Sequence, residues 1–365
     1  MVDFRVLGLL KSLHRQRFSS HVKTKRTFNL TFHSNFSISV QRLGAMARPF
    51  HLNTPLLESV SMTQRVGTPV FLKMENSQPS GSFKIRGIGH LCQQLATDSK
   101  GVVCSSGGNA GMAAAYVARK MCVPATIVVP SSTPQLVVQR LRDQGATVNI
   151  TGKVWDDANA EALRLAEAEG LTYVPPFDHP LLWQGHSSVV SEAAASLEEK
   201  PGAVLLSVGG GGLLCGVIQG LKDVGWTDVP VIAMETVGAD CFNAAVKAGR
   251  LVTLDDITSE AKCLGAKTVC RKAFEFSQSG EISIISELVT DQQALGAVET
   301  FLDEERVLVE MACGAALAAV YSGLVHRLQD EGRLPAPLGP LLVIVCGGSS
   351  MDMEQLSHLK HKLHT

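Results

Sequence analysis

From residue 51 onward, short apolar runs alternate with helix-length amphipathic segments. Apolar runs bounded by turn residues predict strands, and apolar residues repeated every three to four positions predict helices. The predicted strands are 70–74, 102–104, 125–129, 147–150, 203–208, 231–234 and 341–346. The predicted helices are 85–97, 110–121, 134–144, 158–170, 186–199, 213–224, 241–248, 291–304 and 313–331. This alternation is typical of an α/β fold with open, mostly parallel sheets flanked by helices.

A proline pair, Pro175 and Pro176, separates two series of strand–helix units. The chain contains no internal repeat and no low-complexity tract. At 365 residues it is long enough for two domains of ordinary size. We therefore expect two α/β units that face one cleft.

Three of the predicted strands end in glycine-rich turns. These turns are 104–111 (CSSGGNAG), 207–213 (SVGGGGL) and 346–350 (CGGSS). In open α/β sheets, ligands bind beyond the carboxyl ends of the strands, where backbone N–H groups and helix N-termini attract anions. The run Gly209–Gly212 has neither Walker nor dinucleotide-binding spacing. Its unhindered N–H groups, between a strand and a helix, indicate a phosphate site.

A fourth loop of small residues, 79–84 (PSGSFK), ends in Lys84 at the start of a predicted helix. The positive end of the helix dipole and the neighbouring Phe83 both disfavour the ammonium form of this side chain. A partly neutral amine can form an imine with an aldehyde. The alternative is an ordinary solvated lysine near a helix start, and only the accompanying glycine-rich turns favour the chemical role.

Two further candidates lie at the ends of predicted strands. The turn before the predicted helix 110–121 offers backbone donors that suit a substrate carboxylate, and the Asn109 amide suits a phenolic oxygen or a helix cap. Cys346 ends the last strand, where its thiol can contact a ring nitrogen or fill the core.

The composition narrows the class of partner. Hydrophobic residues make up 45% of the chain and charged residues 18%, as in a well-buried globular protein. A net charge of −1 gives no general attraction to nucleic acid or to an anionic membrane, and 5% aromatic residues provide few stacking platforms. No apolar stretch reaches the roughly 18 residues that span a bilayer. We expect a small-molecule partner, with no nucleic acid and no membrane.

The nine cysteines are scattered, and no two have Cys-x-x-Cys spacing. Many lie inside apolar runs, as buried free thiols do in a reducing compartment. This pattern argues against a disulfide framework and against a structural zinc site.

Residues 1–45 differ from the rest and are treated as an N-terminal extension. They contain eight lysines and arginines but one acidic residue, Asp3. Residues 2–19 can form a basic amphipathic helix, as in mitochondrial transit peptides. The alternative is a disordered or upstream extension, since Met46 opens a stretch that reads as an ordinary N-terminus. The expected localisation is cytoplasmic, or mitochondrial if the extension is a transit peptide.

Four motifs together resemble the serine/threonine dehydratases, which are pyridoxal phosphate (PLP) enzymes of the tryptophan-synthase-β fold type. They are 79–87 (PSGSFKIRG), 105–111 (SSGGNAG), 207–213 (SVGGGGL) and 346–348 (CGG), in the family's order, and the similarity extends from about residue 49 to the C-terminus. The chain resembles the serine dehydratase-like branch of this family, because Gly107 stands where the ordinary liver enzyme has alanine. The resemblance implies a two-domain PLP fold type II with a large domain of residues 46–82 and 180–365 and a small domain of residues 83–179. It also implies a homodimer.

The resemblance implies roles for the motif residues. Lys84 would form the imine with PLP and take the Cα proton, while Phe83 would pack on the pyridine ring. The remaining cofactor contacts would come from Asn109 at the ring hydroxyl, from Cys346 at the ring nitrogen, and from Gly209, Gly210, Gly211, Gly212 and Leu213 at the phosphate. The substrate carboxylate would be bound by Ser106, Gly107, Gly108 and Ala110.

A potassium ion near the phosphate loop is also implied by the resemblance. Its ligands would come from Gly209, Glu235, Ala239, Leu264 and Ala266. The chain departs from the family pattern at three positions near the cleft. They are Cys263 in place of alanine or serine, Met311 in place of proline and Ser350 in place of asparagine.

The resemblance implies the dehydration and deamination of L-serine to pyruvate and of L-threonine to 2-oxobutanoate, each with release of ammonia. A neutral Cys346 opposite the ring nitrogen favours loss of the β-hydroxyl over racemisation. Two alternatives stay open. A serine racemase would need a proton-exchanging side chain where this chain has Gly107. A weakly active PLP-binding regulator or partner subunit is suggested by Gly107, Cys263 and Met311.

Overall fold

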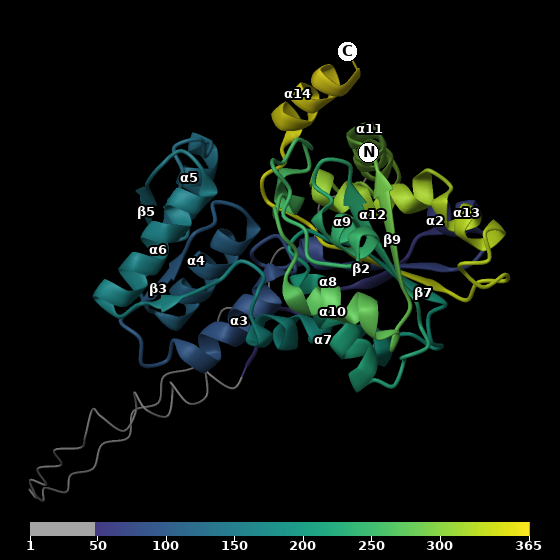
Figure 1. Cartoon of the computed structure of the whole chain (residues 1–365), viewed down its shortest axis with the longest axis horizontal. Coiled ribbons are helices and arrows are strands. Elements are labelled where there is room, and N and C mark those ends of the chain that lie inside the picture. Colours follow the sequence, from purple (N-terminus) through teal and green to yellow (C-terminus); the bar gives the residue numbers. More distant parts are fainter. Residues whose placement is uncertain (1–47, 365) are drawn as a thin grey trace, which may run out of the picture. The chain divides into compact units, whose positions relative to one another are not determined.

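Two mostly parallel sheets organise residues 48–364, the part of the chain that the computed structural model describes (Figure 1). The larger sheet has six strands in the order β1-β2-β10-β7-β8-β9, and the smaller has four in the order β5-β4-β3-β6. Only β1 runs antiparallel to its neighbour. The α/β fold class is therefore confirmed, whereas the predicted extension of residues 1–45 lies outside the described residues.

The larger sheet is built around its fully buried central strands. Its strands are β1 (Leu56–Glu58), β2 (Val70–Met74), β7 (Ala203–Ser207), β8 (Val231–Thr236), β9 (Ile284–Val289) and β10 (Leu341–Val345). Every residue of β7, β8 and β10 is buried, as expected for parallel strands covered by helices on both faces. The register pairs Leu341 with Val70 on one side and with Ala203 on the other.

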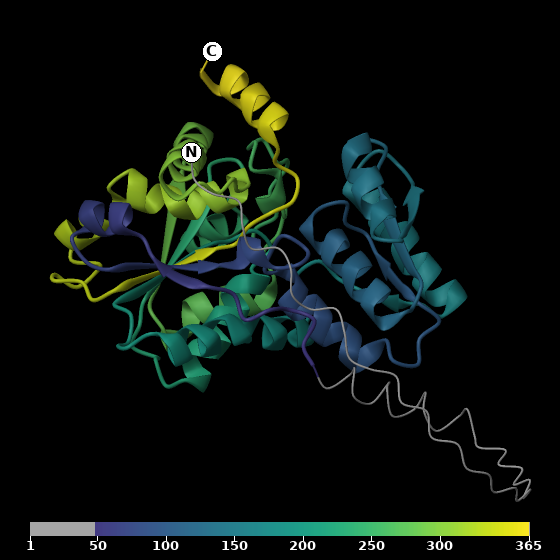
Figure 2. The ribbon, with the colours of Figure 1, turned by 180° about the vertical axis from the view of Figure 1, so that it is seen from behind.

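Helices cover both faces of this sheet (Figure 2). Helices that pack together on one face are α7 (Pro180–Ser196), α8 (Gly212–Asp223) and α10 (Arg271–Ser279). The other face carries α2 (Val60–Val66), α11 (Asp291–Glu305), α12 (Met311–Tyr321) and α13 (Leu324–Asp330). The remaining helices of this part are α9 (Cys241–Ala248), α14 (Met353–His364) and the 3₁₀ turns η1 (Glu75–Ser77) and η2 (Lys262–Leu264).

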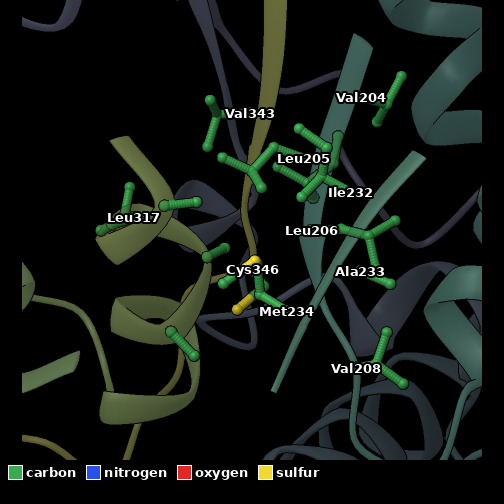
Figure 3. Packing of buried hydrophobic residues seen from close by; sticks show 14 of the residues in the cluster. Val204, Leu205, Leu206, Val208, Ile232, Ala233, Met234, Leu317, Val343 and Cys346 are labelled. Atoms are coloured by element: carbon green, nitrogen blue, oxygen red, sulfur yellow. The ribbon is translucent and has the colours of Figure 1, made fainter. Parts of the chain in front are cut away.

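Part of the core of the larger sheet lies between its strands and α12, and the rest lies against α7 and α8. Helix α12 is apolar all round and is buried from Met311 to Val320, which is typical of a helix packed on every side. Figure 3 shows Leu317 of α12 and Val343 of β10 in the same layer as side chains of β7 and β8. Cys346 follows β10 in this layer, so its side chain lies in the core at the end of the strand.

The smaller sheet is a second α/β layer with its own buried clusters. Its strands are β3 (Val102–Cys104), β4 (Ala125–Val129), β5 (Thr147–Ile150) and β6 (Thr172–Tyr173). Its helices are α3 (Lys84–Leu95), α4 (Asn109–Met121), α5 (Gln135–Asp143) and α6 (Trp155–Glu169). All four of its strands fall within the predicted small domain of residues 83–179. The exact domain boundaries stay a prediction, since α3 packs on both α4 and α7.

The pattern of apolar residues predicted most of these elements, with two kinds of error. The predicted helix 313–331 is two helices, because Gly323 (φ 73°) turns the chain between α12 and α13. The segments without a prediction are β1, β6, β9, α2, α10 and α14. Several are edge strands or short helices, whose half-exposed residues give a weak periodic signal.

Two further observations concern the whole described part. All nine cysteines are free thiols, and seven of them are buried. Within residues 48–364 no single helix is long and apolar enough to cross a membrane, and α12 and α13 meet that criterion only as a pair bent by 50°.

Candidate active site

The turns after β7 and β10 and the first residues of α3 and α4 line one pocket. This pocket brings together all the residues predicted to contact the cofactor, namely Phe83, Lys84, Asn109, Gly209, Gly210, Gly211, Gly212, Leu213 and Cys346. The predicted substrate residues Ser106, Gly107, Gly108 and Ala110 are not part of its lining. They flank Asn109 in the turn that leads into α4.

Three helices begin at this pocket, and none has a side-chain cap at its N-terminus. Their N-cap residues are Phe83 for α3, Gly108 for α4 and Gly211 for α8. The first turn of any helix has N–H groups without an intrahelical acceptor, and these carry the positive end of the helix dipole. An anionic ligand in the pocket would therefore find donors from several directions.

The glycine run after β7 provides the densest set of donors. Within residues 48–364, the N–H groups from Gly209 to Leu213 donate to no other protein atom. Gly211 has φ 88°, a left-handed conformation that favours glycine, and a Cβ there would lie 2.7 Å from the Ala273 Cβ. A Cβ on Gly210 would lie 2.3 Å from the Phe177 ring. Side chains are therefore excluded here, and the bare backbone faces the pocket.

Lys84 stands at the first position of α3 and reaches into the same pocket. Its Nζ donates to the Pro176 carbonyl oxygen at 2.6 Å and lies 5.4 Å from the centre of the Phe83 ring. Desolvation lowers the pKa of the Lys84 amine to about 8, although nearby thiols, Cys263 foremost, act in the opposite direction. Near neutral pH a minor but substantial fraction of the Lys84 side chains is therefore uncharged, and the uncharged amine is the nucleophilic form.

Asn109 is held by a polar network that joins the two sheets. Its Nδ2 donates to Glu310 Oε2 at 2.9 Å, and its Oδ1 accepts from the Ser349 N–H at 3.0 Å. The other Glu310 oxygen accepts from the N–H and the hydroxyl of Ser350, both at 2.7 Å. Glu310 is buried and lines the pocket. The network fixes the Asn109 amide at the pocket wall, where the sequence predicted it.

Two cysteines bring thiols to the pocket wall. A hydrogen bond with Cys313 and burial both hold the pKa of Cys346 well above its ordinary value, so this thiol stays neutral. Cys263 lies on η2 and is exposed to the pocket, with its Sγ 3.9 Å from Asn109 Nδ2. The Cys263 position, one of the departures from the family pattern, therefore faces the ligand space directly.

The residues of the predicted potassium site are only partly brought together. A Cβ on Gly209 would lie 3.0 Å from the Leu264 Cα, so these two backbones touch. The Glu235 carboxylate is fully buried and accepts from the N–H groups of Phe242 and Asn243 at 2.9 and 2.7 Å. Burial nevertheless raises the pKa of Glu235 to about 8. A buried carboxyl of this kind suits a nearby cation, and the potassium site stays a prediction.

Several pocket residues were not singled out from the sequence. Phe177 packs against Gly210, and its carbonyl accepts from Trp183 Nε1 at 2.9 Å. Pro176 accepts the Lys84 hydrogen bond. The only sequence signal for Pro176 and Phe177 was the proline pair that interrupts the helix pattern. The only signal for Glu310 was the departure from the family pattern at the next residue, Met311.

The two histidines of the middle segment behave differently from each other. His179 caps α7, where its Nδ1 accepts from the Leu181 N–H at 3.1 Å. His186 is buried with its ring 5.0 Å from that of Phe83, and its Nδ1 has no hydrogen-bond partner within residues 48–364. His179 thus serves as a helix cap, whereas His186 contacts the Phe83 ring in an edge-to-face arrangement.

These features fit PLP. The free N–H groups and the excluded Cβ positions of Gly209–Leu213 suit its phosphate, and the amine of Lys84 suits its aldehyde. The fold and the site therefore define the class of enzymes that hold a phosphorylated aldehyde cofactor between two α/β units.

Residues 47–347 match the family described as pyridoxal-phosphate dependent enzyme, and the chain belongs to this family. It is 60% identical over 320 residues to the human protein named "Serine dehydratase-like". The alignment covers 87% of this chain and 97% of that relative. The chain is 57% identical to human "L-serine dehydratase/L-threonine deaminase" over 86% of this chain and 96% of that protein. The crystal structure of a fungal L-serine ammonia-lyase from Rhizomucor miehei superposes with a TM-score of 0.80 at 39% identity, covering 86% of this chain and 99% of that one.

Proposed function

We propose that this protein is a PLP-dependent ammonia-lyase that converts L-serine to pyruvate and ammonia and L-threonine to 2-oxobutanoate and ammonia. The observation that carries this proposal is the buried amine of Lys84 in one pocket with the free donors of Gly209–Leu213. The names and identities of the relatives support the substrate class.

The residues of the pocket divide the work of the reaction. Bound PLP supplies an electron sink that acidifies the Cα–H bond of an amino acid. Lys84, in its neutral form, is the base that takes the Cα proton. Phe83 and Asn109 would fix the plane of the ring, and the neutral thiol of Cys346 would place no charge beside its nitrogen. We assign the substrate carboxylate to the turn of Ser106, Gly107, Gly108 and Ala110.

The proposal is tested by turnover of the purified full chain with PLP and each amino acid. We expect one 2-oxo acid and one ammonia per substrate consumed, with D-serine as a minor product. Gly107 has no group that can exchange a proton, and a Cβ there would already lie 3.1 Å from Thr133 Cγ2. D-serine formed as fast as pyruvate would instead identify a racemase. Bound PLP without turnover of either amino acid would identify a regulator.

The phosphate role of the glycine run has its own prediction. Gly211→Ala is expected to weaken PLP binding at least about tenfold, because the new Cβ meets Ala273 and distorts the donors. Gly249→Ala is the matched control, since Gly249 also has a positive φ of 64° but has open space around its Cβ position. Equilibrium titration of each apoprotein with PLP, followed by absorbance, measures the difference. Equal affinities in the two variants would contradict the assignment.

We also propose that a potassium ion binds beside this run, with Glu235 as its charged partner. In potassium-free buffer the folded Glu235 holds its proton up to about pH 8, whereas the unfolded carboxyl loses it near 4.5. The free energy of unfolding should therefore fall between pH 4.5 and 8, by at most roughly 5 kcal/mol. Urea unfolding should show this slope in the wild type and not in Glu235→Gln, and added potassium should reduce it. The same slope in both proteins would contradict the prediction.

The homodimer is proposed on the resemblance alone, and light scattering of the purified protein measures it. The cytoplasmic localisation, with the mitochondrial alternative, depends on residues 1–45 and is likewise a proposal. N-terminal sequencing of the native protein distinguishes the two.

A further inference from the structure

Two cysteines hold the backbone of the glycine run from behind. The N–H of Cys270 donates to the Gly210 carbonyl oxygen at 3.0 Å, and the N–H of Cys215 donates to the Gly211 carbonyl oxygen at 2.9 Å. A Cβ on Gly211 would lie 3.1 Å from Cys270 Sγ, so the loop packs tightly against this thiol. The positions of these two cysteines therefore set the orientation of two consecutive peptide groups in the pocket wall.

The thiols of the same two cysteines face each other. Cys215 lies on the first turn of α8 and Cys270 is the N-cap residue of α10, 55 residues later, and their sulfur atoms are 3.7 Å apart. Both side chains are buried. A disulfide requires a sulfur–sulfur distance of about 2.05 Å. The two sulfur atoms, 3.7 Å apart, must therefore move closer together before they can bond.

The two thiols differ in reactivity. The hydrogen bond with the Cys215 thiol and the Ala273 N–H lower the pKa of Cys270 against the opposing effect of burial, as is common for a cysteine at a helix N-terminus. Burial raises the pKa of Cys215. Cys270 is thus the better nucleophile toward an oxidant, and Cys215 remains the neutral thiol that can resolve the oxidised form.

We propose that Cys215 and Cys270 form a reversible disulfide that moves the glycine run and releases the phosphate of the cofactor. The Cys270 thiolate attacks a hydroperoxide such as H₂O₂, which breaks the O–O bond and gives a sulfenic acid and hydroxide. The Cys215 thiol then displaces the sulfenic hydroxyl, which leaves as water and completes the disulfide. The thiols lose two electrons, the peroxide is reduced to two waters, and an added dithiol reverses the change.

The release step follows from the hydrogen bonds that join the pair to the loop. Closing the distance between the sulfur atoms draws Cys215 and Cys270 together, and their N–H groups draw the Gly210 and Gly211 carbonyls with them. A rotated peptide group turns its own N–H away from the pocket. This step rests on the proposed phosphate role of the glycine run, whereas formation of the disulfide does not.

The test treats the PLP-loaded full chain with stoichiometric H₂O₂. Non-reducing peptide mapping by mass spectrometry is expected to find Cys215 linked to Cys270. The apparent Kd for PLP should rise at least about tenfold and return after dithiothreitol. Cys215→Ala should show no such rise relative to its own reduced form. Cys122→Ser removes an exposed thiol and should respond to peroxide as the wild type does.

Each other outcome overturns a defined part of the proposal. Absence of the Cys215–Cys270 peptide while other thiols are oxidised overturns the disulfide itself, and this readout needs only the wild type. An equal loss of PLP affinity in oxidised Cys215→Ala would assign the effect to pocket thiols such as Cys263. A disulfide without any change in PLP affinity overturns the coupling to the loop. If Gly211→Ala binds PLP normally as well, the phosphate assignment fails instead.

Discussion

Replacing Lys84 by alanine is expected to lower the rate of serine and threonine elimination by about 10⁴-fold or more. The substitution removes both the amine that would bond to the cofactor and the base for the Cα proton. We also expect the visible absorbance of bound PLP to disappear. Because Lys84 makes one hydrogen bond, to Pro176, the fold should persist, as near-ultraviolet circular dichroism would show.

Two companion variants sharpen this experiment. Lys84→Arg keeps the positive charge but is expected to be equally inactive, because a guanidinium neither bonds to an aldehyde nor gives up its proton. Lys120→Ala removes a lysine near the end of α4, away from the pocket lining, and should leave turnover unchanged. Small primary amines added to Lys84→Ala should restore part of the rate. Full turnover by Lys84→Ala without added amine would refute the mechanism.

Arg86→Met is expected to destabilise the protein by about 3–5 kcal/mol. The Arg86 guanidinium is fully buried and donates to both oxygens of Glu75 and both oxygens of Glu192, with four bonds of 2.7 Å. Burial opposes its charge, but these carboxylates raise the pKa of Arg86 further. Removing the cation leaves the fully buried Glu75 carboxylate without its charged partner, whereas Glu192 keeps its ion pair with Lys73 at 2.7 Å. Urea unfolding followed by circular dichroism measures the loss.

The control for this prediction is an arginine in an ion pair at the surface. Arg164 pairs with Glu161 three residues earlier on α6 and is well exposed, so Arg164→Met should change stability little. Arg86 also lies two residues after Lys84 on α3. We therefore expect Arg86→Met to weaken PLP binding even under conditions where it stays folded. A loss of stability no larger than that of Arg164→Met would contradict this account.

The sequence predicted most residues that line the pocket, but it missed several edges of the fold. The glycine-rich turns and Lys84 were found because each motif carries its chemistry locally, in bare N–H groups or in an amine at a helix start. The inner strands were found because they are nearly continuous apolar runs, and β2, β3 and β4 have the predicted bounds. The edge strand β9 was missed because it is only partly buried and has no such run.

The contacts that complete the pocket depend on residues far apart in the chain. Glu310 reaches Asn109 across 201 positions, and Cys215 meets Cys270 across 55. No local pattern marks a carboxylate or a thiol for such a partner. Phe177 follows a proline pair with no periodic neighbours, so its packing against Gly210 emerges only when the two series of units fold together.

The network around Glu310 has a consequence for the entry of substrate. One carboxylate is shared between Asn109, which begins a helix of the smaller sheet, and Ser350, which follows the last strand of the larger one. A motion that separates Asn109 from Ser350 must break one of the hydrogen bonds to the Glu310 carboxylate. Breaking it costs free energy, because a hydrogen bond to a charged group contributes about 1.5–3 kcal/mol. This carboxylate therefore restrains opening of the cleft, together with the hydrogen bonds from Ser349 to Asn109 and from Arg140 to Ser349.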